Sequence, residues 1–307
     1  MTRAPNSWTI DALHNVRGSE MTEMHYEAPR TLKAAVALLA GAAGPARVLA
    51  GGTDLLIKMK HRKIAPRYLI NIKRVPDLNY IRHDEREGLR IGALTTIHAI
   101  VNSPLIKKRF PVLNCASSVL GTRQVRNLAT LGGNLCNSSP AAECAPALLT
   151  LEANVKIEGP GGKRSLPVEE FFLGPDRNAL ADDEILTEIQ VPDTPIHTGG
   201  VYIKHSTRRI DVSIVGVAVV VTCDDHVCRD IKIALGSVGP KPFRARKAEN
   251  VLKGQKLSEE MLNKAAQVAS EESFPIDDIR GYADYRKKMV ETLVKEGIEK
   301  AIGETRL

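Results

Sequence analysis

The stretches Leu49-Ala-Gly-Gly-Thr-Asp-Leu-Leu56 and Thr130-Leu-Gly-Gly-Asn-Leu-Cys-Asn137 are the most informative parts of this 307-residue chain. In each, a Gly-Gly pair adjoins apolar residues and is accompanied by a threonine and a short polar residue. Because glycine has no Cβ, such a turn lets backbone N–H groups approach an anion closely. Either turn alone would more often be an ordinary turn. Together, the two predict a pair of loops that grip one diphosphate.

The sequence lacks the common nucleotide and hydrolase motifs. It contains neither G-x-G-x-x-G nor G-x-x-x-x-G-K-[ST], which argues against a Rossmann dinucleotide site or a P-loop. It also lacks G-x-S-x-G and H-E-x-x-H, and its eight histidines are scattered without ligand spacing. If the chain takes part in catalysis, we therefore expect the reactive atoms to belong to a cofactor.

Composition indicates a folded protein of more than one domain. Hydrophobic residues make up 43% and charged residues 26%, which is ordinary for a globular chain and excludes overall disorder. The formal charge of +7 comes from several basic segments without interleaved aromatic residues or a recognition motif, so nucleic-acid binding is not expected. Solvated faces or a docking surface for an acidic partner explain these segments better.

Targeting and cysteine signals are weak. No apolar run reaches the roughly 18 residues that a membrane span needs, and residues 1–20 contain no signal-peptide core, so a cytoplasmic protein is expected. The five cysteines include no C-x-x-C pair, which favours reduced thiols. Cys136 and Cys144 lie in or near the second loop and are interpreted as structural or merely close to a cofactor, and no metal site is predicted.

The pattern of apolar residues and breakers predicts an α+β chain. A helix capped by Thr31 and short strands around 47–50 and 68–72 form a first unit. A hairpin near 79–93 and strands at 154–158 and 184–191 form a second. A final unit combines three strands with helices; its expected segments are 200–205, 210–222, 229–236, 258–271 and 283–302.

Several motifs carry a family resemblance over nearly the whole chain, about residues 24–303. They are Ala50-Gly-Gly-Thr-Asp54, Ile91-Gly-Ala-Leu-Thr-Thr96, Thr130-Leu-Gly-Gly-Asn134, Ser139-Pro-Ala-Ala-Glu143, the segment Tyr202–Gly216 and Tyr285-Arg-Lys-Lys-Met289. In this order they resemble the FAD-binding medium subunits of molybdenum hydroxylases, the family of carbon monoxide dehydrogenase and xanthine dehydrogenase.

The resemblance implies a fold and its domains. We expect an N-terminal extension at 1–23, then a two-subdomain FAD-binding domain of the PCMH type at 24–197, divided into about 24–77 and 78–197. A smaller domain of the CO dehydrogenase flavoprotein type should follow at 198–307, with a three-stranded antiparallel sheet and a helical cluster.

The resemblance also implies an electron-transfer function. A large molybdopterin-binding subunit would act on the substrate, and a small subunit with [2Fe-2S] clusters would pass electrons to FAD on this chain. The flavin would then reduce an external electron acceptor. A dimer of heterotrimers is the implied assembly, and no catalytic side chain is expected on this chain.

Residue by residue, the resemblance assigns cofactor contacts to eighteen positions. Glu143, where many relatives have aspartate, would accept from ribose or adenine-side hydroxyls, and Lys204 would donate to a ring carbonyl of the flavin. Leu120 and Leu186 would be apolar contacts of the ring. The full set is Val48, Leu49, Ala50, Gly51, Gly52, Thr53, Asp54, Leu55, Thr95, Leu120, Thr130, Leu131, Gly132, Gly133, Asn134, Glu143, Leu186 and Lys204.

Alternatives remain open at this stage. Without the resemblance, Leu120 and Leu186 would be core residues, Thr95 a helix cap and Lys204 an exposed strand residue. A free-standing flavin oxidoreductase of the vanillyl-alcohol oxidase group would need a substrate-binding cap domain, for which the roughly 110 residues after Gly199 leave little room. A flavin-free scaffold subunit is disfavoured because both Gly-Gly pairs are intact.

Overall fold

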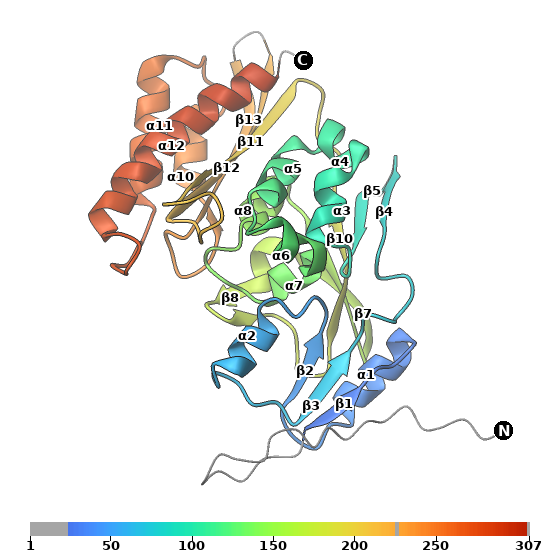
Figure 1. The fold of residues 1–307 in the computed structure, drawn as a ribbon. Coiled ribbons are helices and arrows are strands. Elements are labelled where there is room, and N and C mark those ends of the chain that lie inside the picture. Colours follow the sequence, from blue (N-terminus) through green and yellow to red (C-terminus); the bar gives the residue numbers. More distant parts are fainter. Residues whose placement is uncertain (1–23, 225–226, 306–307) are drawn as a thin grey trace, which may run out of the picture.

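The computed structural model describes residues 24–224 and 227–305, so the expected extension at 1–23 lies outside the described residues. Figure 1 shows three sheet-containing parts arranged along the chain, with the helices of the middle part between the two outer ones. Every helix in the described ranges is too short or too polar to cross a membrane.

The first part is a parallel three-stranded sheet in the order β1-β3-β2. Its helix α1 begins where predicted, because the Thr31 side chain caps it by accepting from the N–H of Ala34 at 3.1 Å. The strand β2 runs directly into the first Gly-Gly loop, which leads to α2. The elements are β1 (His25–Glu27), α1 (Leu32–Ala40), β2 (Ala46–Leu49), α2 (Leu55–Lys60) and β3 (Tyr68–Asn71).

The second part is an antiparallel five-stranded sheet in the order β4-β5-β10-β6-β7. Short helices lie between β5 and β6 in the chain, and several start at a threonine or serine cap. The elements are β4 (Ile81–Asp84), β5 (Gly88–Gly92), α3 (Ile97–Asn102), α4 (Pro104–Arg109), α5 (Pro111–Ser118), α6 (Arg123–Leu128), α7 (Leu131–Cys136), α8 (Cys144–Thr150), β6 (Asn154–Gly159), β7 (Gly162–Pro167), α9 (Val168–Phe171), β8 (Phe172–Gly174), β9 (Arg177–Asn178) and β10 (Ile185–Val191).

The C-terminal part is an antiparallel sheet with a helical layer, as predicted, but two details differ. The sheet has a short fourth strand, in the order β11-β12-β13-β14. The strand expected from Ile210 begins only at Val215, because 206–214 form a turn in which Asp211 N–H donates to the Arg208 carbonyl at 2.9 Å. The elements are β11 (Thr198–His205), β12 (Val215–Asp224), β13 (Val227–Gly236), β14 (Phe243–Arg244), α10 (Arg246–Leu252), α11 (Glu259–Glu271) and α12 (Ala283–Glu304).

The C-terminal sheet is covered on both faces (Figure 1). One face packs on α5 and α8, and its buried side chains, such as Tyr202 and Val220, belong to the core of the second part. The other face packs on α10 and α12, and α11 packs against both of these helices, around a separate core. Since side chains alternate along a strand, the even-numbered residues of β11 face the second part and the odd-numbered ones face α12. This alternation decides where Lys204 lies.

Candidate functional site

The first Gly-Gly loop presents consecutive backbone donors without acceptors. The N–H groups of residues 51–54 make no hydrogen bond to any residue that the structure describes. Gly52 has φ of +81°, a conformation that suits glycine, and the loop leads directly into α2. Successive N–H groups in such a turn form a concavity that attracts an anion. The loop therefore has the donors that the predicted diphosphate site requires.

Gly51 must be glycine for a reason that the sequence did not reveal. A Cβ at this position would lie 2.2 Å from the carbonyl oxygen of Leu128 and 3.1 Å from the Cα of Ala129. These two residues immediately precede Thr130, so the close approach joins the first loop to the second. The structure thus brings the two loops together through backbone contact, rather than only through a shared ligand.

The second Gly-Gly segment is not a loop of free donors. It forms the start of α7, capped by Thr130, whose hydroxyl accepts from the N–H of Gly133 at 3.1 Å. The N–H groups of Leu131 and Gly132 donate to the carbonyls of Thr95 and Ala93, each at 3.0 Å. Gly132 is fixed by this packing, since a Cβ there would lie 2.7 Å from Ala93. The backbone donors of this segment are already used within the protein.

Side chains supply the free polar groups of the second segment. The Oδ1 atom of Asn134 is buried, and no described residue bonds it. A buried polar atom without a partner is costly, so it marks a place where a ligand or water is expected. A Cβ on Gly133 would meet only the Thr130 hydroxyl oxygen, at 2.9 Å, so the space beside it is otherwise open. Open space beside an unpaired amide fits a bound polar group such as a dinucleotide.

Four of the predicted residues belong to the framework. The Thr95 side chain is 1% exposed, and its hydroxyl exchanges two hydrogen bonds with the backbone of Tyr80, at 2.9 and 3.1 Å. Leu120, Leu131 and Leu186 are buried in the core of the second part. Their contact with a cofactor stays a prediction.

The other predicted residues of segment 48–55 lie in the strand and loop around Gly51. Val48 and Leu49 are the last residues of β2 and pair with β3, and Leu55 is the first residue of α2. Thr53 and Asp54 lie between them, and the Asp54 side chain makes no capping hydrogen bond to α2.

Glu143 and Lys204 face each other across the boundary between the second part and the C-terminal sheet. Lys204 Nζ lies 2.9 Å from Glu143 Oε1 and also donates to the carbonyls of Val119, at 3.0 Å, and Arg209, at 3.3 Å. The Lys204 side chain is 3% exposed, so its interpretation as a surface residue is wrong. Its three donors are all used. A bond to a ring carbonyl of a ligand would require one of these bonds to be exchanged.

Burial governs the electrostatics of this pair. Burial raises the pKa of Glu143, the Lys204 ammonium opposes that rise, and the charge of Asp54 in the first loop adds to it. The influence of Asp54 shows that Glu143 lies within electrostatic reach of the first Gly-Gly loop. The structure thus gathers both loops and the ion pair in one region.

A second link connects the two Gly-Gly segments, and no sequence pattern indicated it. Lys58 on α2 forms an ion pair with Asp176 at 2.6 Å, and the N–H of Asp176 donates to the Ser138 carbonyl at 3.2 Å. Ser138 follows α7, so this chain of contacts connects the element after the first loop to the element after the second. These residues are too far apart in sequence for a local pattern to relate them.

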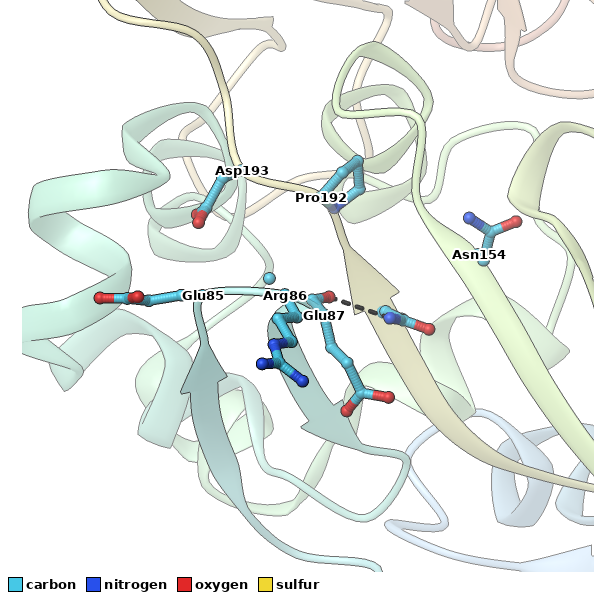
Figure 2. Close-up of a pocket in the computed structure, with 8 residues that line it drawn as sticks. Glu85, Arg86, Glu87, Asn154, Pro192 and Asp193 are labelled. Carbon is cyan, nitrogen blue, oxygen red and sulfur yellow. Dashed lines mark hydrogen bonds between the residues drawn. The ribbon is translucent and has the colours of Figure 1, made fainter.

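A polar cavity of about 220 Å³ lies elsewhere, at the turn between β4 and β5. Figure 2 shows Glu85 and Asp193 on one side of it and Asn154 on the other. Two residues that line the cavity are joined by a hydrogen bond, in which Gln190 Nε2 donates to the Glu87 carbonyl at 2.9 Å. None of the residues that line it belongs to either Gly-Gly segment, so it has no part in the site described above.

Comparison with known proteins identifies the family of the chain. Residues 21–194 match the family described as the FAD binding domain in molybdopterin dehydrogenase, and residues 201–301 match the CO dehydrogenase flavoprotein C-terminal domain. The chain belongs to the FAD-binding medium subunits of molybdenum hydroxylases. Among relatives of this medium subunit, the carbon monoxide dehydrogenase medium chain of Hydrogenophaga pseudoflava is 35% identical, over 90% of this chain and 96% of the relative.

Other relatives give the same picture. The xanthine dehydrogenase FAD-binding subunit of Escherichia coli O157:H7 is 31% identical over 90% of this medium subunit and 95% of the relative. The solved carbon monoxide dehydrogenase of Hydrogenophaga pseudoflava superposes with a TM-score of 0.89, covering 92% of this chain and 98% of that one. The chain is therefore the flavoprotein medium subunit of a complex of the CO dehydrogenase and xanthine dehydrogenase type.

Proposed function

We propose that this medium subunit receives electrons from the [2Fe-2S] clusters of a small subunit and passes them through FAD to an external acceptor. A large molybdopterin-binding subunit acts on the substrate, which does not touch this chain. FAD, when bound, supplies the redox chemistry, because a flavin can take up electrons singly and release them as a pair. The observation that carries this proposal is the row of N–H groups at residues 51–54, which no described part of the chain bonds.

Each part of the site has a proposed task. The segment 48–55 holds the diphosphate with its backbone donors, and the hydroxyl of Thr130 and the amide of Asn134 bind polar groups beside it. The Glu143 carboxylate accepts from hydroxyl groups of the cofactor. Leu120 and Leu186 provide apolar walls, and Thr95 supports the second segment through its carbonyl, which accepts from the N–H of Leu131.

Lys204 is proposed to lie near the flavin ring and also to hold neighbouring segments of the protein in position. Its bonds to Val119, Glu143 and Arg209 hold three segments around the site. When a ligand binds, the ammonium group keeps a positive charge next to the site, which favours negative charge on a reduced cofactor.

Purification of the native complex tests the proposal. We expect the absorption spectrum of an oxidised flavin, about one FAD per medium subunit, and bleaching of that spectrum when the complex is given its reducing substrate. A chain that purifies without flavin would favour the flavin-free scaffold. A lone chain that oxidises an organic substrate by itself would favour the free-standing oxidoreductase.

Three finer points belong to the same proposal. The complex is proposed to be a dimer of heterotrimers, which mass measurement of the co-expressed subunits tests. The domain boundaries near residues 23, 77 and 197 are proposed, and limited proteolysis tests them. The cytoplasmic location expected from the sequence stays a prediction, to be tested by cell fractionation.

A further inference from the structure

We propose that Lys58 and Asp176 are positioning residues for the cofactor, because their ion pair holds the first Gly-Gly loop in the conformation that binds a diphosphate. We call this contact the α2 ion pair. The inference rests on the proposed function for the identity of the ligand, and it adds two residues outside the predicted set of cofactor contacts. Three observations carry it: the weak attachment of α2, the firm attachment of Asp176, and a second carboxylate near Lys58.

The helix α2 has no buried face. None of its six residues is buried by the described part of the chain, and Leu56 and Ile57 are exposed on its surface. With described residues, α2 forms a single ion pair, in which Lys58 Nζ lies 2.6 Å from Asp176 Oδ1. A short helix is held mainly by the packing of an apolar face, which α2 lacks. The α2 ion pair therefore has a large share in fixing the orientation of this helix.

The first Gly-Gly loop is continuous with α2. The carbonyl of Gly52 accepts from the N–H of Leu56 at 3.1 Å, so the loop already contains the first backbone bond of the helix. At its other end the loop is fixed by the close approach of Gly51 to the Leu128 carbonyl. The N–H groups of residues 51–54 therefore lie between two points of attachment, and the α2 ion pair supports the second of them.

Asp176 is held firmly by the second Gly-Gly segment. It belongs to the turn between β8 and β9, which lies beside α2 in Figure 1. Its N–H donates to the carbonyl of Ser138 at 3.2 Å, and the side chain of Asn178 donates to the carbonyl of Cys136 at 2.8 Å. Both acceptors lie at the C-terminal end of α7. The turn thus gives Lys58 a fixed partner, and a loop that is fixed before binding loses less conformational entropy when it binds.

Lys58 also lies near a carboxylate of the loop itself. Desolvation raises the pKa of Asp54, the Lys58 ammonium opposes that rise, and the charge of Asp176 adds to it. A diphosphate bound at residues 51–54 would be repelled by the negative charge of Asp54, and the ammonium group offsets this repulsion. Lys58 can therefore assist the cofactor in two ways, by positioning the loop and by its charge.

The substitution Asp176→Asn separates positioning from charge. It breaks the α2 ion pair and removes a negative charge near the proposed diphosphate, so electrostatics alone predicts tighter binding of FAD. Positioning predicts weaker binding. Asp176 has φ of +57°, a left-handed conformation that aspartate and asparagine both adopt more readily than most residues. The substitution therefore suits the backbone of the turn.

The experiment is titration of the full-length, flavin-free chain with FAD, followed by the flavin fluorescence. For Asp176→Asn and for Lys58→Met we expect binding about threefold to tenfold weaker than in the wild type, with faster release of FAD. Lys58→Arg should restore most of the affinity, since a guanidinium can donate to the same carboxylate. The side chains of Lys58 and Asp176 are 26% and 69% exposed, so denaturant unfolding of the flavin-free variants should match the wild type.

Lys295→Met is the matched control. Lys295 pairs with Glu259 at 3.1 Å between α12 and α11, and its side chain is 30% exposed, close to the value for Lys58. The control removes an ion pair of similar exposure from helices that carry none of the predicted cofactor contacts. We expect it to bind FAD with the affinity of the wild type.

Each contrary outcome has a distinct meaning. Unchanged or tighter FAD binding by Asp176→Asn would overturn the positioning role and leave the proposed function intact. Weaker binding accompanied by an equal loss of stability in the flavin-free chain would make the pair a structural one, which also overturns the inference. Equal weakening in Lys295→Met would do the same. A wild-type chain that binds no FAD would contradict the proposed function itself.

Discussion

Lys204 and Glu143 form an ion pair of 2.9 Å between β11 and the residue that precedes α8, with both side chains at least nine-tenths buried. The pair joins the C-terminal sheet to the part that carries the second Gly-Gly segment. Removing either partner of this buried ion pair would leave an uncompensated charge in a buried region, which is strongly destabilising.

Lys204→Met should destabilise the protein strongly. We expect a loss of about 3 to 5 kcal/mol in the free energy of unfolding, since the Glu143 carboxylate would be buried without its partner. Denaturant unfolding of the purified chain measures this. The double variant Lys204→Met with Glu143→Leu should recover much of the loss. If the double variant were as unstable as the sum of the two single changes, the pair would not be coupled.

Glu188 should make stability depend on pH. Burial alone would raise its pKa, but hydrogen bonds from Arg90, Lys156 and Tyr80 outweigh burial and hold the pKa below 4.5. The stabilisation is therefore present above pH 4.5 and is lost as the pH falls through the lower folded value. Glu188→Gln should cost about 3 kcal/mol at pH 7, and the difference from wild type should shrink in acid.

The test for Glu188 is a set of unfolding curves for both proteins between pH 7 and pH 3. A difference that stays constant over this range would show that the charge of Glu188 makes no contribution. The conservative change retains the size of the side chain, so packing cannot account for a pH-dependent difference.

Gly51→Ala should disturb the junction of the two Gly-Gly segments. The new Cβ would lie 2.2 Å from the Leu128 carbonyl oxygen, so one loop must shift, at a cost of about 1 to 3 kcal/mol. We expect less bound FAD and a lower melting temperature. Gly161→Ala is the control, because no atom of residues 24–224 or 227–305 lies within 4 Å of a Cβ there. Full flavin content in Gly51→Ala would show that the junction tolerates displacement.

Asn134→Ala should separate cofactor binding from folding. No residue in the described ranges bonds the buried Oδ1 atom, so its removal should leave the stability of the flavin-free chain unchanged or slightly higher. In the presence of FAD the variant should bind about tenfold more weakly, which corresponds to one lost hydrogen bond of about 1.4 kcal/mol. Titration of the flavin-free chain with FAD measures both quantities. A large loss of stability with unchanged affinity would assign Asn134 to the framework.

Local signals in the sequence were enough for much of the fold. Thr31 caps α1 as predicted, and Ser258 caps α11 in the same way, because a cap depends only on residues three positions away. The Gly-Gly segments indicated the site for the same reason, since the conformation that a glycine pair allows is a local property of the backbone. The strand expected to begin at Ile210 was wrong over its first residues. Ile210 and Val212 are apolar, which suggested a strand, but their side chains are exposed on the surface.

Contacts between distant residues could not be predicted. Nothing local relates Gly51 to the Leu128 carbonyl, or Lys58 to Asp176, which is 118 residues away in the chain. The two Gly-Gly segments look alike in sequence, yet one leaves its backbone donors free and the other uses them within the fold. The difference arises because the carbonyls of Thr95 and Ala93 accept from the second segment, and their positions are set by the tertiary fold.

The alternation along β11 limits how this protein can change in length. An insertion or deletion of one residue within 198–205 would exchange the residues that face the two neighbouring layers, so Lys204 and His205 would each point to the wrong partner. Such a change would undo the link to Glu143 and the link to Tyr285 at once. Within the family, we therefore expect changes in chain length to collect in the turns that flank β11 and to avoid the strand itself.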